Sequence, residues 1–96
     1  MSAESRGERS ASLQIRNKLG LHARAARMFV ETSNRFDAEV SVAKDGQVVN
    51  GRSIMGVMML AAEQGSEISV TTSGPQAAEA LDAIRELVEA GFNEPQ

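Results

Sequence analysis

The sequence predicts an α+β fold in which a four-stranded, mainly antiparallel sheet carries three helices on one face. Three observations support this fold. Four short segments alternate apolar and polar residues, as strands with one buried face do. Three other segments repeat their apolar residues at helical spacing. The outward strand positions are all polar, so helices cover only one face of the sheet. The predicted element order, β-α-β-β-α-β-α, suits the split β-α-β topology.

Composition limits the chemistry that the chain can perform. Its 96 residues, 42% hydrophobic and 24% charged, suffice for one domain with a modest core. The chain has no cysteine and only one histidine, which excludes thiolate sites and multi-histidine metal centres within one chain. A net charge of −3 and an aromatic content of 3% argue against nucleic-acid binding. No apolar run is long enough to span a membrane. We predict no metal, no cofactor and no nucleic-acid or membrane partner, and a cytoplasmic location.

The first elements follow from the local pattern. Residues 1–11 are polar and predict a disordered tail. Residues 12–17 alternate and predict a strand with Leu13 and Ile15 facing inward. Residues 23–33 then show helical spacing. The predicted buried face of this helix comprises Ala26, Phe29, Val30 and Ser33.

A β-hairpin is predicted next. Residues 38–43 alternate, with Val40 and Val42 facing inward, and Asp45-Gly46 supplies the residues that a type I′ turn requires. Residues 47–50 form the return strand. Because this strand is short, we expect it at an edge of the sheet.

The second half of the chain predicts helix, strand and helix. A helix should run from Ser53 to about Gln64 and stop at Gly65. Residues 66–72 alternate as a strand with Ile68 and Val70 inward. Pro75 takes the first position of the last helix, which ends at Gly91. The buried stripe of that helix is Ala77, Leu81, Ile84 and Val88. The predicted domain covers residues 12–92, followed by a tail at 93–96.

The single histidine, His22, comes directly before the helix predicted at 23–33. The first backbone N–H groups of a helix have no intrahelical partner, and with the helix dipole they attract anions. This positive end favours the neutral imidazole. We therefore predict a nucleophilic His22 whose attached phosphoryl group would accept hydrogen bonds from those N–H groups.

Arg24, two residues further on, adds a planar set of donors that suits a phosphate. Hydrogen bonds to charged groups contribute roughly 1.5–3 kcal/mol each, against ~0.3–1 kcal/mol for the helix dipole. Arg24 should therefore contribute more than the dipole. Residue types and spacing alone also allow a plainer interpretation, in which His22 is a solvent-facing helix cap and Arg24 a surface charge.

The segment after Ser53 predicts a contact surface. Ser53 is a helix N-cap by pattern, which alone explains a serine there. A helix on one sheet face cannot bury every side, and Val57, Leu60 and Ala61 fit the inward stripe. Gly56 inside this helix predicts a close backbone approach. Three further apolar residues predict an exposed, adaptable surface: Ile54, Met55 and Met58. The alternative is a more deeply buried helix.

The run Gly20-Leu-His-Ala-Arg-Ala-Ala26 closely resembles the HPr family, the histidine phosphocarriers of the bacterial phosphotransferase system. The resemblance covers roughly residues 13–91 and implies an open-faced sandwich. It implies that His22 takes a phosphoryl group on its pros nitrogen from enzyme I, charged by phosphoenolpyruvate, and passes it to an EIIA-type acceptor. Arg24 would stabilise the phosphate. Such a protein is a substrate of its partners. The resemblance also implies a monomer.

The Ser53-Ile-Met-Gly56 run resembles the family's regulatory site. By that resemblance, HPr kinase/phosphorylase phosphorylates Ser53, which would affect a transcriptional regulator. The implied partner-binding residues are Ala23, Arg27, Ile54, Met55 and Met58. One departure is Ala25, where the family usually has proline. It leaves open a second function, a nitrogen-type or catabolite-control module whose phosphorylation state selects partners instead of driving sugar uptake.

Overall fold

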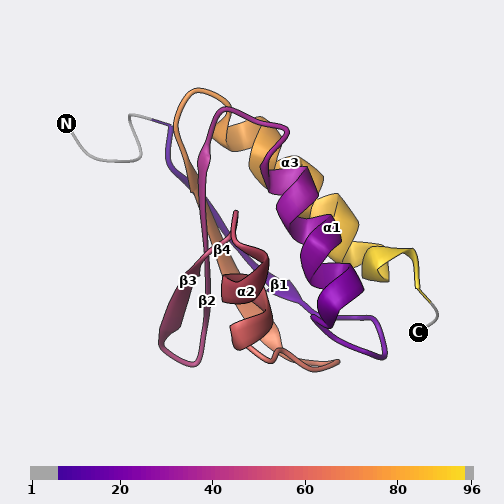
Figure 1. Ribbon diagram of the computed structural model, residues 1–96. Coiled ribbons are helices and arrows are strands. Elements are labelled where there is room, and N and C mark those ends of the chain that lie inside the picture. The colour runs from indigo at the N-terminus through magenta and orange to yellow at the C-terminus, as the bar shows by residue number, and fades with distance from the viewer. Residues whose placement is uncertain (1–6, 95–96) are drawn as a thin grey trace.

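The computed structural model describes residues 7–94 and shows a sheet with helices packed on one face (Figure 1). The elements in chain order are β1 (Arg9–Gln14), α1 (Ala23–Ser33), β2 (Glu39–Lys44), β3 (Gln47–Asn50), α2 (Ile54–Met59), β4 (Glu67–Ser73), α3 (Ala77–Glu89) and a 3₁₀ turn, η2 (Gly91–Asn93). The predicted class and element order are confirmed.

The sheet has the order β1-β4-β2-β3, and all three strand pairs are antiparallel. The short strand β3 lies at an edge, as predicted. Asp45 and Gly46 connect β2 to β3 with φ values of 51° and 83°, so the predicted turn with two left-handed residues is confirmed.

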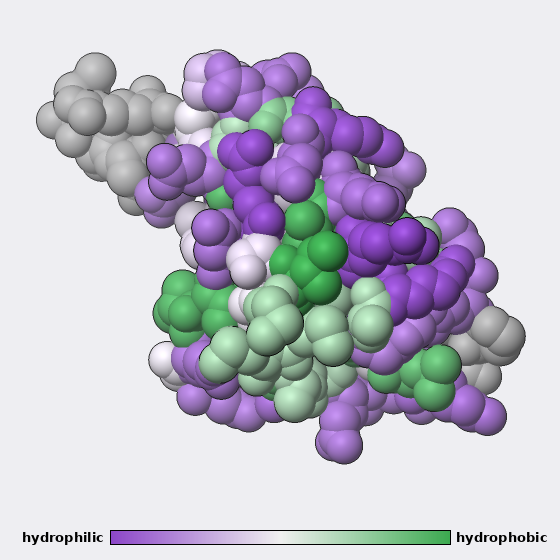
Figure 2. Space-filling view, in the orientation of Figure 1, coloured by the Kyte–Doolittle hydropathy of each residue, from purple (hydrophilic) through white to green (hydrophobic). Residues whose placement is uncertain are grey.

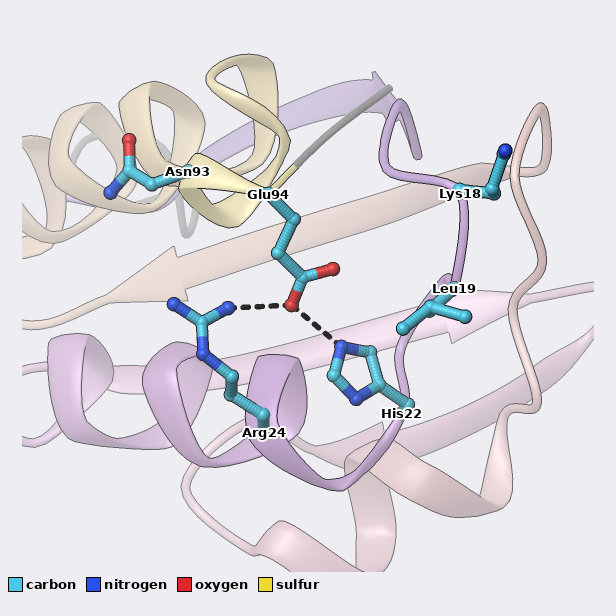
Figure 3. Close-up of a pocket in the computed structure, with 6 residues that line it drawn as sticks. All are labelled: Lys18, Leu19, His22, Arg24, Asn93 and Glu94. Atoms are coloured by element: carbon cyan, nitrogen blue, oxygen red, sulfur yellow. Dashed lines mark hydrogen bonds and ion pairs between the residues drawn. The ribbon is translucent and has the colours of Figure 1, made fainter.

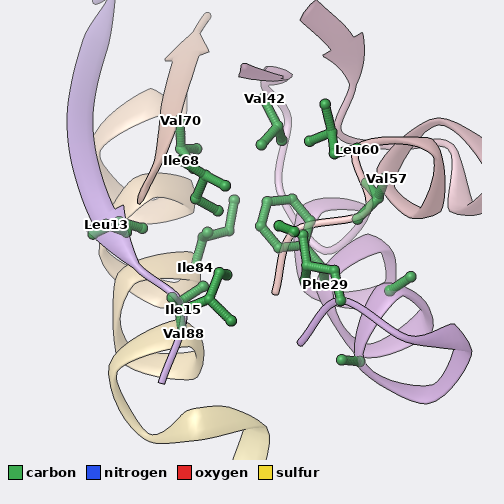
Figure 4. Packing of buried hydrophobic residues seen from close by; sticks show 14 of the residues in the cluster. Leu13, Ile15, Phe29, Val42, Val57, Leu60, Ile68, Val70, Ile84 and Val88 are labelled. Atoms are coloured by element: carbon green, nitrogen blue, oxygen red, sulfur yellow. The ribbon is translucent and has the colours of Figure 1, made fainter. Parts of the chain in front are cut away.

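One apolar core lies between the sheet and the helices. Helices α1 and α3 contact each other, and Figure 4 shows strand and helix side chains meeting around Phe29. Every predicted inward residue of the strands, of α1 and of α3 is buried. These residues are Leu13, Ile15, Ala26, Phe29, Val30, Ser33, Val40, Val42, Ile68, Val70, Ala77, Leu81, Ile84 and Val88. Alternation and helical spacing therefore located the core correctly.

Strand β1 begins at Arg9, three residues before the predicted start at Ser12. Residues 9–11, assigned above to the polar tail, pair with β4 instead, and Ser10 hydrogen-bonds across the sheet to Thr71 at 3.0 Å. Ala11 packs against the core two positions before Leu13, so the alternation of inward and outward residues begins earlier than predicted. The remainder of the predicted tail, residues 1–6, lies outside the described residues.

Helix α2 ends at Met59, whereas the sequence predicted a helix reaching Gln64. The next residues turn away, and Ala61 has a φ of 50° and an exposed side chain, so its predicted place on the inward stripe was wrong. Tertiary hydrogen bonds explain the early end. The carbonyl of Ala62 accepts the N–H of Leu21 at 2.9 Å, and Ala62 is buried in place of Ala61.

Helix α3 begins at Ala77, and Pro75 lies in the preceding turn, not at the first helical position. The turn is held to the loop before β2: the N–H of Gln76 donates to the carbonyl of Asp37, and the N–H of Asp37 donates to the Gln76 side chain. These contacts delay the helix by two residues. The helix ends at Glu89, and Gly91, two residues later with a φ of 63°, prevents its continuation as predicted.

None of the helices within residues 7–94 combines the length and apolar character needed to cross a lipid bilayer.

Candidate functional site around His22

His22 is the N-cap residue of α1, with extended backbone angles (φ −71°, ψ 178°) and no hydrogen bond from its side chain to the helix end. Its carbonyl accepts the first helical bond, from Ala26 at 2.8 Å. The N–H groups of the first turn therefore open beside the ring, as the sequence predicted. The imidazole is 29% exposed, so it is positioned by the protein and still open to a reactant.

A carboxylate that the sequence analysis placed in the C-terminal tail lies at the centre of the site. Glu94 Oε2 is 2.6 Å from His22 Nε2 and 2.6 Å from Arg24 Nη1 (Figure 3). Arg24 Nη1 also donates to the carbonyl of Phe92 at 3.3 Å. The Glu94 side chain is only 10% exposed, against 48% for Arg24. The predicted pair, His22 and Arg24, is thus joined through a residue 70 positions away from Arg24 in the sequence.

Asn17 holds the other oxygen of this carboxylate. The fully buried Asn17 amide donates from Nδ2 to Glu94 Oε1 at 3.0 Å and to the carbonyl of Gly20 at 2.8 Å. Its own Oδ1 is buried without a hydrogen-bond partner among the described residues. A flipped amide would direct Oδ1 at two acceptors. The two acceptors therefore fix which way the amide points, although an unpaired buried oxygen costs about 1–3 kcal/mol.

Glu94 is ionised at neutral pH. Burial alone would raise the pKa of its carboxyl, but hydrogen bonds from Asn17, His22 and Arg24 outweigh that effect and hold the pKa below its ordinary value of 4.5. An ionised carboxylate only accepts hydrogen bonds. His22 Nε2 must therefore carry the proton of this contact. In a neutral imidazole the lone pair is then on Nδ1, which lies on the side of the ring away from Glu94 (Figure 3).

The segment before Glu94 has a strained backbone. Phe92 and Asn93 have φ values of 55° and 59°, and neither is glycine. This region costs about 1–2 kcal/mol for a bulky residue such as Phe92, whereas asparagine adopts it more readily. Phe92 is fully buried, and its side chain anchors the turn in the core. The strain turns the chain so that Glu94 points at His22, and such strain is characteristic of functional sites.

Sequence reasoning missed Glu94 and Asn17 because neither stands in a local pattern with His22. The polar residues of the 93–96 stretch read as a tail, and Asn17 read as the end of a strand. Phe92, a large apolar residue just after the predicted helix stop, was the one available signal that the chain stays attached there.

An exposed apolar surface on α2 lies beside His22. Helix α2 exposes four large apolar side chains, here called the α2 patch: Ile54 (40% exposed), Met55 (71%), Met58 (38%) and Met59 (64%). Figure 2 shows it as a continuous apolar area. The predicted exposure of its first three members is confirmed, and the more deeply buried alternative was wrong. His22 and Met58 line one shallow pocket, so the patch adjoins the ring.

Ser53 caps α2, as predicted: its Oγ accepts the N–H of Gly56 at 3.1 Å. A side chain at Gly56 would approach the carbonyl of Asn50 to 3.2 Å, which confirms the close backbone approach. Ala23 and Arg27, the other predicted contact residues, are exposed on α1.

Comparison with known proteins identifies the family of the chain. A family model described as the PTS HPr component phosphorylation site matches residues 9–90. The phosphocarrier protein HPr of Neisseria meningitidis serogroup A is 49% identical over 83 residues, covering 86% of this chain and 93% of that protein. The chain therefore belongs to the HPr family of phosphocarrier proteins of the phosphotransferase system.

Solved structures extend the similarity to the fold. HPr of Thermoanaerobacter tengcongensis matches with a TM-score of 0.88 and 39% identity over 92% of this chain and 99% of that one. The Bacillus subtilis catabolite repression protein Crh matches with a TM-score of 0.71 and 39% identity over 88% and 94% of the two chains. That Crh structure is described as a domain-swapped dimer.

Proposed function

We propose that this chain accepts a phosphoryl group from phospho-enzyme I on Nδ1 of His22 and passes it to an EIIA-type acceptor. The observation that carries the proposal is the contact of His22 Nε2 with the ionised Glu94, which leaves Nδ1 as the nucleophilic nitrogen at the open end of α1. Membership of the HPr family supports the same reaction. Such a carrier works where its partners are, in the cytoplasm.

The transfer needs no group besides those of the two proteins. The Nδ1 lone pair forms a bond to phosphorus, while the bond between phosphorus and its donor atom in enzyme I breaks and leaves its electron pair on that atom. Nε2 keeps its proton, so the ring becomes a phosphorylated imidazolium. First-turn N–H groups of α1 are placed to bind the phosphoryl oxygens. The second transfer reverses these steps toward the acceptor.

Arg24 supplies the movable cation of this site. Its guanidinium is held by Glu94 and by the Phe92 carbonyl, but it remains 48% exposed and carries further donors. We expect it to turn toward the phosphoryl group, because a group with about two negative charges attracts it more strongly than one carboxylate.

The direct test is labelling with radioactive phosphoenolpyruvate and enzyme I. We expect acid-labile label on the wild-type chain and none on H22A. R24A should be labelled at least about tenfold more slowly, a loss comparable to one hydrogen bond to a charged group. R35A, an exposed arginine just after the end of α1 and away from His22, is the control for loss of one positive charge. An unlabelled wild-type chain, or equal labelling of H22A, would overturn the proposal.

A regulatory function is a second candidate, and one observation favours it. Ser53 is half-buried at the start of α2, the helix that carries the α2 patch, so a phosphate on its Oγ would stand beside that patch. Phosphorylation adds about −1.5 to −2 charge and would weaken the docking of acidic partners. In this function HPr kinase/phosphorylase modifies Ser53, and a transcriptional regulator is among the partners selected.

Partner selection separates the two candidates. The unmodified chain, the His22-phosphorylated chain and S53D would each be used to capture proteins from cell extract, with S53A as the control for loss of the cap. A set of captured proteins that changes with each form supports regulation. An identical set for all three forms contradicts it.

A further inference from the structure

We infer that Glu94 is a positioning residue for phosphoryl transfer: its carboxylate orients the His22 ring through Nε2–H and stabilises the imidazolium that forms when Nδ1 takes the phosphoryl group. This inference rests on the proposed function, and it assigns a role to a residue that the reaction itself does not touch.

The contact pattern of the carboxylate carries the inference. Oε2 is 2.6 Å from both His22 Nε2 and Arg24 Nη1, whereas Oε1 accepts from Asn17 at 3.0 Å. Asn17 is fully buried, so its amide is a fixed anchor, whereas Arg24 is 48% exposed and is the partner that we expect to turn away. When Arg24 turns to the phosphoryl group, Glu94 therefore keeps Asn17 and His22 as partners.

The charges favour this arrangement during transfer. Bond formation at Nδ1 places a positive charge on the ring, and part of it resides on Nε2–H. An ionised carboxylate accepting from that proton stabilises the charge, and the 10% exposure of Glu94 limits its screening by water. The arrangement resembles other activated nucleophiles, in which a third group orients the reacting side chain. Here the Glu94 carboxylate orients the ring that carries the nucleophilic Nδ1.

Backbone strain gives independent support. Two consecutive non-glycine residues, Phe92 and Asn93, adopt left-handed angles immediately before Glu94. In a solvated tail Phe92 would relax, since its bulky side chain disfavours these angles. Here Phe92 is buried and its carbonyl accepts from Arg24, so the fold maintains a strained turn that delivers one carboxylate to the ring.

The test compares E94A and E94Q with wild type in steady-state transfer from phosphoenolpyruvate through enzyme I, with the concentration of the carrier varied. E94Q keeps the shape and removes the charge. E89Q, on the exposed side of α3, is the matched control for loss of one negative charge. We expect kcat to fall about tenfold in E94A and by less in E94Q. This is below the roughly 10²–10⁴-fold typical of general acid–base groups, because Glu94 does not transfer the proton itself and the 29% exposed ring also reaches water. KM should stay unchanged, since the Glu94 side chain is only 10% exposed and lies outside the α2 patch.

A spectroscopic readout separates positioning from a merely structural role. In nitrogen-15 NMR of the unphosphorylated chain, the proton on His22 Nε2 should exchange slowly with water in wild type and E89Q, and rapidly in E94A. Matching circular dichroism spectra establish that each variant is folded. Wild-type kcat in E94A and E94Q, or equally slow proton exchange in E94A, overturns the inference alone. A wild-type chain that takes no label overturns the proposed function and the inference together.

Discussion

At the scale of single residues, the ion pairs of Glu94 stabilise the folded chain only while its carboxyl is ionised. Its pKa is lowered in the folded state by the hydrogen bonds from Asn17, His22 and Arg24, which outweigh the effect of burial. A lowered carboxyl pKa adds stability above the ordinary pKa of 4.5, and that stability is lost as the pH falls through the folded pKa. The affected window therefore lies below 4.5.

We predict that E94Q is less stable than wild type by about 1 kcal/mol at pH 7, a modest value because Arg24 is half-exposed and screened by water. The difference should shrink as the pH is lowered from 4.5. Urea denaturation followed by circular dichroism measures it, since the chain has no Trp or Tyr for fluorescence. E89Q should match wild type throughout. A difference that is the same in acid and at pH 7 would contradict the prediction.

Local residue patterns were sufficient for half of the candidate site. His22 and Arg24 stand two positions apart at a helix start, and Ser53 stands at another, so each is visible within a short window of sequence. Glu94 and Asn17 are separated by 77 positions, and their contact depends on a strained turn after α3 that no local pattern encodes. Local patterns therefore miss residues that are distant in sequence and meet only when the chain folds back.

At the scale of elements, the loop before α1 is fixed by backbone contact with the chain after α2. Gly20 has a φ of 66°, and a Cβ added there would lie 2.2 Å from the carbonyl oxygen of Ala62. Only glycine fits both the angle and the space. This contact places the start of α1, and with it His22, against the end of the helix that carries the α2 patch.

We predict that G20A loses about 3 kcal/mol or more, from a left-handed alanine at about 1–2 kcal/mol together with a backbone clash. The matched variant is G46A. Gly46 has a φ of 83° but nothing within 4 Å of an added Cβ, so only the conformational cost of about 1–2 kcal/mol applies. Urea denaturation of both variants provides the comparison. Equal losses would show that the contact with Ala62 contributes nothing.

Helices and strands could be predicted where a residue pattern repeats. The residues at which some of them begin or end could not. The bounds of α1 and β3 agree with alternation and spacing, because each repeat reports directly on a buried face. The end of α2 is set by the hydrogen bond from Leu21 to Ala62, and the start of α3 by bonds between Gln76 and Asp37. Such contacts stop or delay a helix whose local sequence would continue it.

At the scale of the whole molecule, the polar edge strands bear on assembly. Strand β3 has four residues, and β1 presents Arg9, Ser10, Ser12 and Gln14, so both edges are short or polar. Such edges discourage pairing between chains. The α2 patch comprises only four side chains, which is a small area for a permanent interface.

We therefore predict a monomer of 10.2 kDa in solution, measured by sedimentation velocity over a wide range of protein concentrations. The comparison with the dimeric Crh structure makes the measurement informative. A species of twice that mass whose fraction rises with concentration would contradict the prediction.

The pocket shared by His22 and Met58 has a kinetic consequence. His22 and the α2 patch lie on one side of a small protein, so only one partner protein can bind there at a time. The phosphoryl donor and the phosphoryl acceptor would then bind alternately, and each must dissociate before the other can bind. We expect ping-pong kinetics, with an excess of either unloaded donor or unloaded receiver slowing the flow by occupying the carrier. The relative concentrations of donor, carrier and acceptor would thus determine the rate of phosphoryl transfer, even with every rate constant unchanged.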